Sequence, residues 1–189
     1  MTVNEIFFRN EIAQNIPLVN DGVKLSKSTL ANVMLLRASC EKQVQNFESE
    51  MSECLTRLKQ EGFDKRKIAY EEMKMVDKKK YAHDNWDGQG EKPDAPTKEE
   101  LLAAEETRLT ANDFEKEENE LKEAYFELRK KASEKDIRFN ASILRDDFAD
   151  ICEIVGIDGD MNYRKLYSNE IVTVQKKDFL SVIASNLVL

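Results

Sequence analysis

Apolar residues recur at helical spacing through a long stretch of the chain that begins after Leu25. They follow one face of a helix at Leu30, Val33, Leu36, Cys40, Val44, Phe47, Met51, Cys54 and Leu58. From Val44 onward the spacing alternates between three and four residues, which is the seam of a coiled coil. Ser26 is placed to cap the start, with Leu25 and Leu30 as a hydrophobic staple. This pattern predicts a long amphipathic helix.

A second helical stretch, roughly 64–82, follows the interruption at Gly62, and Asp64 can cap it. The pattern fits either a kinked continuation of the first helix or a separate helix. Residues 83–97 contain two Gly, two Pro and several Asp or Asn, which is typical of a loop.

A further helix is predicted from Thr97 to about Lys135. Thr97-Lys98-Glu99-Glu100 is a capping box directly after Pro96, and Phe114, Leu121 and Leu128 keep one heptad position. The stretch 110–113 is a candidate break or second cap. A narrow apolar seam needs a partner, so we expect residues 26–136 to form a long antiparallel, coiled-coil-like hairpin that turns in loop 83–97.

Residues 1–25 form a predicted N-terminal docking arm. Ile6, Phe7 and Phe8 lie in a short amphipathic stretch that ends at Pro17, and Asn20-Asp21-Gly22 is a turn signal compatible with a hairpin or a simple reversal. The arm can dock on the chain's own core or on a partner.

Residues 137–189 have a different pattern of apolar and polar positions, with shorter predicted elements. Residues 138–143 alternate like a short strand, 146–155 have helical spacing, 156–162 form a turn, and 170–175 form a β-branched strand before a last helix from Lys177. The sequence thus predicts a mainly α protein with a small α+β C-terminal lobe.

The charge balance limits the classes of partner. Charged residues make up 35% of the chain, apolar residues 41%, and the net charge is −8. An acidic chain repels phosphate backbones, so nucleic-acid binding is not expected, and Lys78-Lys79-Lys80 is interpreted as a solvated face. No run of about 18 apolar residues and no secretory signal is present, so neither a membrane span nor secretion is expected.

The residue types that carry chemistry are scarce. The three cysteines show no pairing pattern and are interpreted as buried small hydrophobes. The only histidine, His83, lacks the Glu-x-x-His context of a di-iron bundle. Asp158 to Asn162 opens like a calcium loop, but Tyr163 stands where Gly is required, and Gly88-Gln89-Gly90 lacks a phosphate-loop context. We therefore predict no catalytic, cofactor-binding or metal-binding residues, no cofactor, and no enzymatic activity.

Aromatic and aliphatic anchors near the ends and in the loop are the candidate contacts with other proteins. They are Ile6, Phe7, Phe8, Tyr81, Trp86, Phe179 and Leu180. Trp86, the only tryptophan, is either a contact hot spot or folds back and orders the loop.

The order of segments resembles a group of small helical-hairpin proteins from the structural and tail gene modules of tailed bacteriophages. Val23-Lys24-Leu25 leads into Leu30-Ala31-Asn32 and a hairpin, and the chain ends with Lys177-Asp178-Phe179-Leu180-Ser181-Val182-Ile183. The resemblance lies in pattern and order, and the extra helix and loop at 62–97 depart from it. It implies a virion or assembly component in the host cytoplasm or the virion.

These patterns favour a structural or assembly subunit that contacts other protein subunits. The alternative is a cytosolic helical chaperone or adaptor that binds a basic protein partner, and a third hypothesis is a regulator that mimics nucleic acid through its acidic helices.

Overall fold

The computed structural model describes residues 1–20 and 22–188 and divides the chain into two compact units. Unit 1 consists of Met1–Met51 and Lys130–Leu189, and unit 2 of Ser52–Arg129. The sequence predicts other boundaries, at 25 and 136, because helical patterns continue across both divisions. Asp21 of the predicted turn and Leu189 of the predicted lobe lie outside the described residues.

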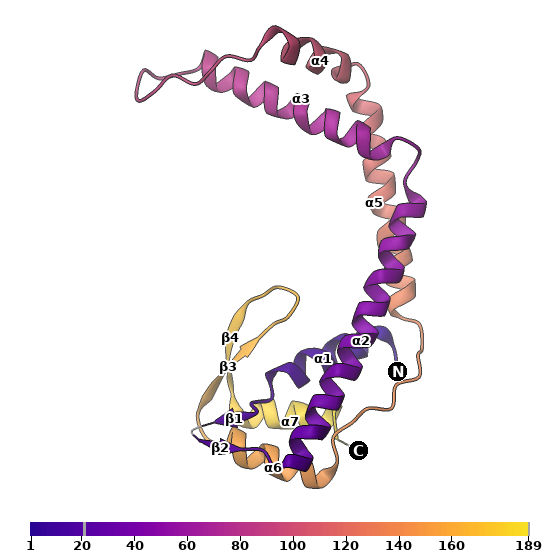
Figure 1. Ribbon diagram of the computed structural model, residues 1–189, viewed down its shortest axis with the longest axis vertical. Coiled ribbons are helices and arrows are strands. Elements are labelled where there is room, and N and C mark those ends of the chain that lie inside the picture. The colour runs from indigo at the N-terminus through magenta and orange to yellow at the C-terminus, as the bar shows by residue number, and fades with distance from the viewer. Residues whose placement is uncertain (21, 189) are drawn as a thin grey trace. The chain divides into compact units, whose positions relative to one another are not determined.

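The fold is mainly α with a small α+β C-terminal region, as the sequence predicts. The helices are α1 (Val3–Asn15), α2 (Lys27–Leu58), α3 (Phe63–Asp84), α4 (Lys98–Arg108), α5 (Ala111–Ser133), α6 (Arg145–Val155) and α7 (Lys176–Asn186) (Figure 1). The strands form two antiparallel pairs, β1 (Val19–Asn20) with β2 (Val23–Lys24) and β3 (Asp160–Arg164) with β4 (Ile171–Gln175). Within the described residues, no helix is both long and apolar enough to cross a membrane.

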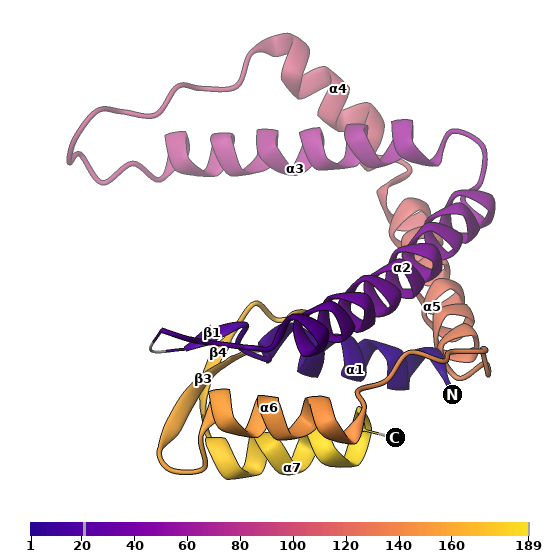
Figure 2. The same ribbon diagram turned by 60° about the horizontal axis from the view of Figure 1, so that its bottom comes forward.

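Unit 1 is built around one hydrophobic core. Its buried side chains come from α1, the first half of α2, α6 and α7, and from the segments that join them: Ile6, Ile12, Ala13, Ile16, Leu25, Val33, Leu36, Cys40, Ile143, Ile151, Ile154, Val155, Phe179, Leu180, Ile183 and Leu187. Figure 2 shows α6 and α7 side by side beneath α1. The N-terminal segment therefore docks on the chain's own core, which is one of the two possibilities that the sequence leaves open.

The start of α1 is fixed by a capping box that the sequence analysis missed. The Thr2 hydroxyl accepts from the Glu5 N–H at 3.2 Å, and the Glu5 carboxylate accepts from the Thr2 N–H at 2.7 Å. The helix ends before Pro17, at the C-cap residue Ile16, as the sequence predicts.

The small strands of unit 1 follow the sequence pattern only in part. β1 and β2 pair as antiparallel strands, with Val19 opposite Lys24 and Asn20 opposite Val23. β4 confirms the predicted strand, but its partner β3 begins at Asp160, inside the predicted turn.

The predicted strand at 138–143 is wrong. Of this stretch only Ile143 makes a bridge, with Val188, and its N–H donates to the Leu187 carbonyl at 2.7 Å. The alternation instead reflects Phe139 and Ala141, which pack partly against the core while the chain remains irregular. Alternating burial of side chains does not make a segment a β-strand unless a neighbouring backbone is available for hydrogen bonding.

Unit 2 contains the antiparallel pair α3 and α4, joined by the predicted loop (Figure 1). α3 is a separate helix, because Gly62 has φ +74° and lets the chain turn between α2 and α3. The predicted helix from Thr97 is broken at Leu109 and Thr110, which separate α4 from α5. Its predicted capping box is present, with the Thr97 hydroxyl accepting from the Glu100 N–H at 3.1 Å. Loop 83–97 therefore joins two shorter helices, and its first two residues are still helical.

Candidate protein-contact site

The predicted contact residues of unit 1 divide between its core and its surface. Ile6 is 0% exposed and Leu180 is 7% exposed, so both are core residues and neither offers a surface to a partner. Phe8 is 47% exposed, whereas Phe179 is 3% exposed and is a core residue whose ring also lines a surface hollow. The structure brings Phe8 and Phe179 together at one hollow, although they are far apart in the sequence.

Phe7 is held by other rings of unit 1. Its ring lies 5.5 Å from that of Phe47 in an edge-to-face arrangement and 5.0 Å from that of Tyr167. Aromatic pairs at these separations stabilise packing beyond the area that they bury. Phe7 therefore joins α1 to α2 and to the loop after β3.

The two candidates of unit 2 lie at the end of α3 and in the loop that follows it. Tyr81 is 72% exposed and Trp86 is 39% exposed. The Trp86 indole N–H donates to the Gln89 carbonyl at 3.2 Å, so the ring orders its own loop while part of it stays accessible.

The hollow of unit 1, here called the α1–α7 hollow, has a volume of about 260 Å³. Its lining comes from α1, β3, β4 and α7 and consists of Phe8, Glu11, Tyr163, Val174, Asp178, Phe179 and Val182. Typical small-molecule sites occupy roughly 300–1,000 Å³, so this hollow is of a size to hold one side chain.

Local structure sets the orientation of each lining residue. Phe8 and Glu11 are three residues apart on α1 and share one face, as Phe179 and Val182 do on α7. In the β3–β4 hairpin the half-buried positions alternate, which turns Tyr163 and Val174 toward the core side.

Glu11 holds the hairpin against α1. Its carboxylate accepts from the Tyr163 hydroxyl at 2.9 Å and from the Leu166 N–H at 3.0 Å. Burial, and next the hydrogen bond to Glu11, raise the pKa of the Tyr163 hydroxyl well above its ordinary value. Tyr163 thus stays a neutral donor, and its ring meets that of Phe179 edge-on at 5.8 Å.

The charged side chains that line the hollow are all acidic. Glu11 and Asp178 are its charged lining residues, and no basic side chain is among the described residues that line it. Asp178 lies in the first turn of α7, where the helix dipole favours a carboxylate. Three aromatic rings beside two carboxylates suit an aliphatic chain that ends in a cation, through apolar contact, cation–π attraction and charge.

Of the residues that line the hollow, only Phe8 and Phe179 are predicted from the sequence as contact residues. Glu11 lies three residues after Phe8 in a predicted helical stretch, so the two side chains share a face. This spacing could have identified Glu11 as a neighbour of Phe8. Tyr163 could not be found in this way, because β3 was predicted to be mostly turn and the contact with Glu11 spans 152 residues.

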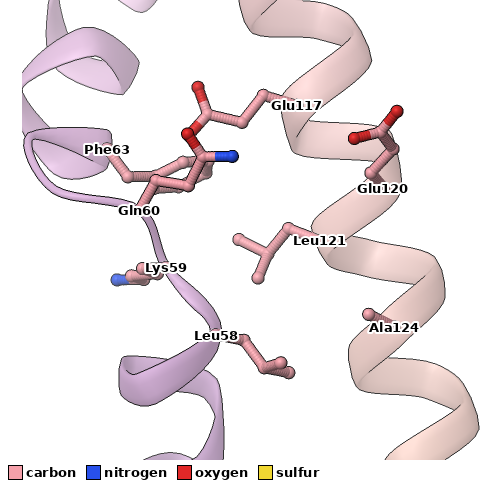
Figure 3. A pocket seen from close by; sticks show the side chains of 8 residues that line it. All are labelled: Leu58, Lys59, Gln60, Phe63, Glu117, Glu120, Leu121 and Ala124. Atoms are coloured by element: carbon pink, nitrogen blue, oxygen red, sulfur yellow. The ribbon is translucent and has the colours of Figure 1, made fainter.

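A second hollow, of about 160 Å³, lies in unit 2 where the chain passes from α2 to α3 and faces α5. In Figure 3, Leu58 and Leu121 extend into it from opposite sides, and Lys59 points away. Its charged lining residues are already paired within the unit: Lys59 with Asp64 at 2.7 Å, Glu117 with Arg66 at 2.6 Å and Glu120 with Lys116 at 3.8 Å. We interpret this hollow as a gap in internal packing.

The described residues contain no group of three or more His, Cys, Asp or Glu side chains placed to hold a metal ion. The thiol of Cys40 is buried, and burial raises its pKa to about 11. Comparison of the chain with protein-family models, with curated proteins and with solved structures finds no match.

Proposed function

We propose that this chain is a non-enzymatic assembly subunit, in a tailed-phage virion or in head or tail assembly, that receives a basic side chain of a partner subunit in the α1–α7 hollow. The observation that carries the proposal is the meeting of Phe8 and Phe179 with two carboxylates, Glu11 and Asp178, in one hollow of side-chain size. An arginine or lysine matches both its apolar walls and its charge.

The walls of the hollow come from a well-packed unit. Glu11 and Tyr163 are fixed by hydrogen bonds, and Phe179 is anchored in the core of unit 1. A preformed site of this kind costs little conformational entropy on binding, which suits a subunit that must recognise its neighbour during assembly.

The pocket is tested with small probes on the full chain. N-acetyl-arginine amide, N-acetyl-norleucine amide and N-acetyl-glutamate amide are titrated while the methyl signals of Val174 and Val182 are followed by NMR. We expect the arginine probe to shift both signals most and the glutamate probe least. Equal shifts with the glutamate probe, or none with arginine, would contradict the proposal.

Matched variants distinguish the contribution of charge to probe binding from that of apolar packing. Asp178→Asn should weaken the arginine response and leave the norleucine response unchanged, and Phe8→Ala should weaken both. Ile171→Ala is the control, because Ile171 is 66% exposed on β4 and does not line the hollow.

A chaperone or adaptor that binds a basic partner is the second candidate, and the same carboxylates favour it. Quantitative mass spectrometry of purified particles distinguishes the two. A virion subunit is present at fixed stoichiometry, whereas a chaperone is absent from the finished particle and binds its partner in a salt-sensitive way.

A further inference from the structure

The outer face of α2 carries exposed apolar side chains over its first four turns. Leu30 is 37% exposed, Met34 49% and Leu35 63%, and Ala31 and Ala38 on the same side of the helix are also exposed. These five residues, here called the α2 face, lie opposite the buried side of the helix, which faces the core of unit 1.

The α2 face is unusual in a chain that is 35% charged. From Ser28 to Cys40 the only charged residue is Arg37, whose guanidinium is turned toward the end of α1. It donates to the carbonyl oxygens of Ala13 at 2.9 Å and Ile16 at 2.6 Å. Arg37 therefore caps α1, and the α2 face itself contains no charge.

Covering this face costs little desolvation, because no charged group must leave water. The same helix changes character beyond it: Glu41, Lys42, Glu50 and Glu53 are all exposed. The uncharged face is thus bounded by Lys27 at one end and by Glu41 at the other.

We infer that the α2 face binds the same face of a second copy of this chain, with the two helices antiparallel about a twofold axis near Met34. Lys27, Ala31, Met34, Ala38 and Glu41 follow one another at intervals of four and three residues, the spacing of a helix-pairing seam. Ala31 and Ala38 let two helices approach closely, with Leu30 and Leu35 on the flanks.

The charges at the two ends of the α2 face favour a second copy of the chain as the partner and an antiparallel arrangement of the two helices. Lys27 and Glu41 each lie seven residues from Met34, so a twofold axis there places Lys27 of one copy opposite Glu41 of the other, twice. A parallel pair would place like charges opposite each other. The face is therefore complementary to itself in one orientation only. The interface is independent of the α1–α7 hollow, whose residues it does not share.

Sedimentation equilibrium of the full chain tests the pairing. We expect a dimer for the wild type and a dimer at least about tenfold weaker for Met34→Glu, which buries two charges near the axis. Met75→Glu is the matched control, because Met75 is 61% exposed on α3 in unit 2, and it should remain dimeric. A monomeric wild type, or equal dimerisation of Met34→Glu and the wild type, would overturn the inference.

Disulfide cross-linking tests the direction in a background in which Cys40 is replaced by Ala and Cys54 and Cys152 by Ser. Met34→Cys should form disulfide-linked dimers, and so should a mixture of Lys27→Cys and Glu41→Cys chains. Lys27→Cys alone should not. Cross-linking of Lys27→Cys with itself would indicate a parallel pair and reject the antiparallel one. Circular dichroism of each variant verifies that it is folded.

Discussion

Among the described residues, the hydrophobic core of unit 1 contains sixteen buried side chains, whereas that of unit 2 contains six: Phe63, Tyr70, Met73, Val76, Ala104 and Phe114. Unit 2 also contains ion pairs, including the partly buried Arg66–Glu117 and the exposed Arg108–Asp77, both at 2.6 Å. Exposed ion pairs contribute less than a buried apolar side chain does.

The difference suggests a division of roles between the two units. A large core fixes the positions of the surfaces that it supports, and both the α1–α7 hollow and the α2 face lie on unit 1. Unit 2 has a small core and exposes Ile68, Met75, Leu102 and Leu109. We therefore expect unit 2 to open at lower denaturant concentration than unit 1, as a separate cooperative segment.

The largest expected effect comes from Phe114→Ala in unit 2. The Phe114 ring lies 5.4 Å from that of Phe63 and 5.1 Å from that of Tyr70, both on α3, so it joins α5 to α3. Removal of the ring should lower the free energy of unfolding of unit 2 by about 3–5 kcal/mol and abolish amide protection in α3 and α4. Hydrogen exchange measured by mass spectrometry would show the loss. Phe126→Ala, at a position 64% exposed on α5, should change little. An equal loss of protection in α6 and α7 would mean that the two units unfold together.

Ile183→Ala should have the next largest effect, about 2–5 kcal/mol, because Ile183 is fully buried in the core of unit 1. Here the amide protection of α6 and α7 should fall and that of α3 and α4 should persist. Ala184→Gly, at an exposed neighbour on the same helix, controls for helix propensity and should cost about 1 kcal/mol or less. If both variants lose the same stability, the core contact of Ile183 is not what supports unit 1.

The helical part of the fold was predictable because its signals are local. The Ser26 cap, the Thr97 capping box, the loop after α3 and the last helix all follow from residues within a few positions of each other. The structure also confirms the possible break near Thr110.

The small strands and the site depend on contacts that are distant in sequence. β3 is stabilised by pairing with β4 and by Glu11, and nothing within residues 160–164 indicates either. The α2 face was missed for a different reason. Leu30 was assigned to the inward stripe, where it extends the apolar pattern, but it lies on the exposed side of α2. Apolar residues on both sides of a helix cannot be sorted into core and contact surface by periodicity alone.

A smaller effect is expected from Arg66→Gln, which removes the two-point contact between the guanidinium and the Glu117 carboxylate. Arg66 is 40% exposed, so solvent screens the pair and the expected loss is about 1 kcal/mol, confined to unit 2. The salt dependence of unit 2 stability should decrease with it. Lys116→Gln, which removes a 3.8 Å pair between exposed side chains, serves as the control and should be nearly neutral. If Lys116→Gln instead removed the salt dependence of unit 2 stability, that dependence would come from the general surface charge and not from the Arg66–Glu117 pair.

The smallest effect concerns the polar contact that joins α2 to α6 in unit 1. The buried Thr29 hydroxyl donates to the Asp150 carboxylate at 2.5 Å, and hydrogen bonds from Thr29 and then Ser26 hold the pKa of Asp150 below its ordinary value. The contact therefore stabilises unit 1 above the ordinary Asp pKa of about 3.9, and this contribution is lost as the pH falls through the lower pKa of the folded state.

Thr29→Val keeps the shape of the side chain and removes the donor, so the pKa of Asp150 should rise toward its ordinary value, while Thr29→Ser should leave it low. Carboxyl carbon shifts measured by NMR from neutral to acidic pH distinguish the two variants. An unchanged Asp150 titration in Thr29→Val would mean that Ser26 alone holds the carboxylate. The acid sensitivity of unit 1 would then depend on the hydrogen bonds from Ser26 to Asp150 rather than on the one from Thr29.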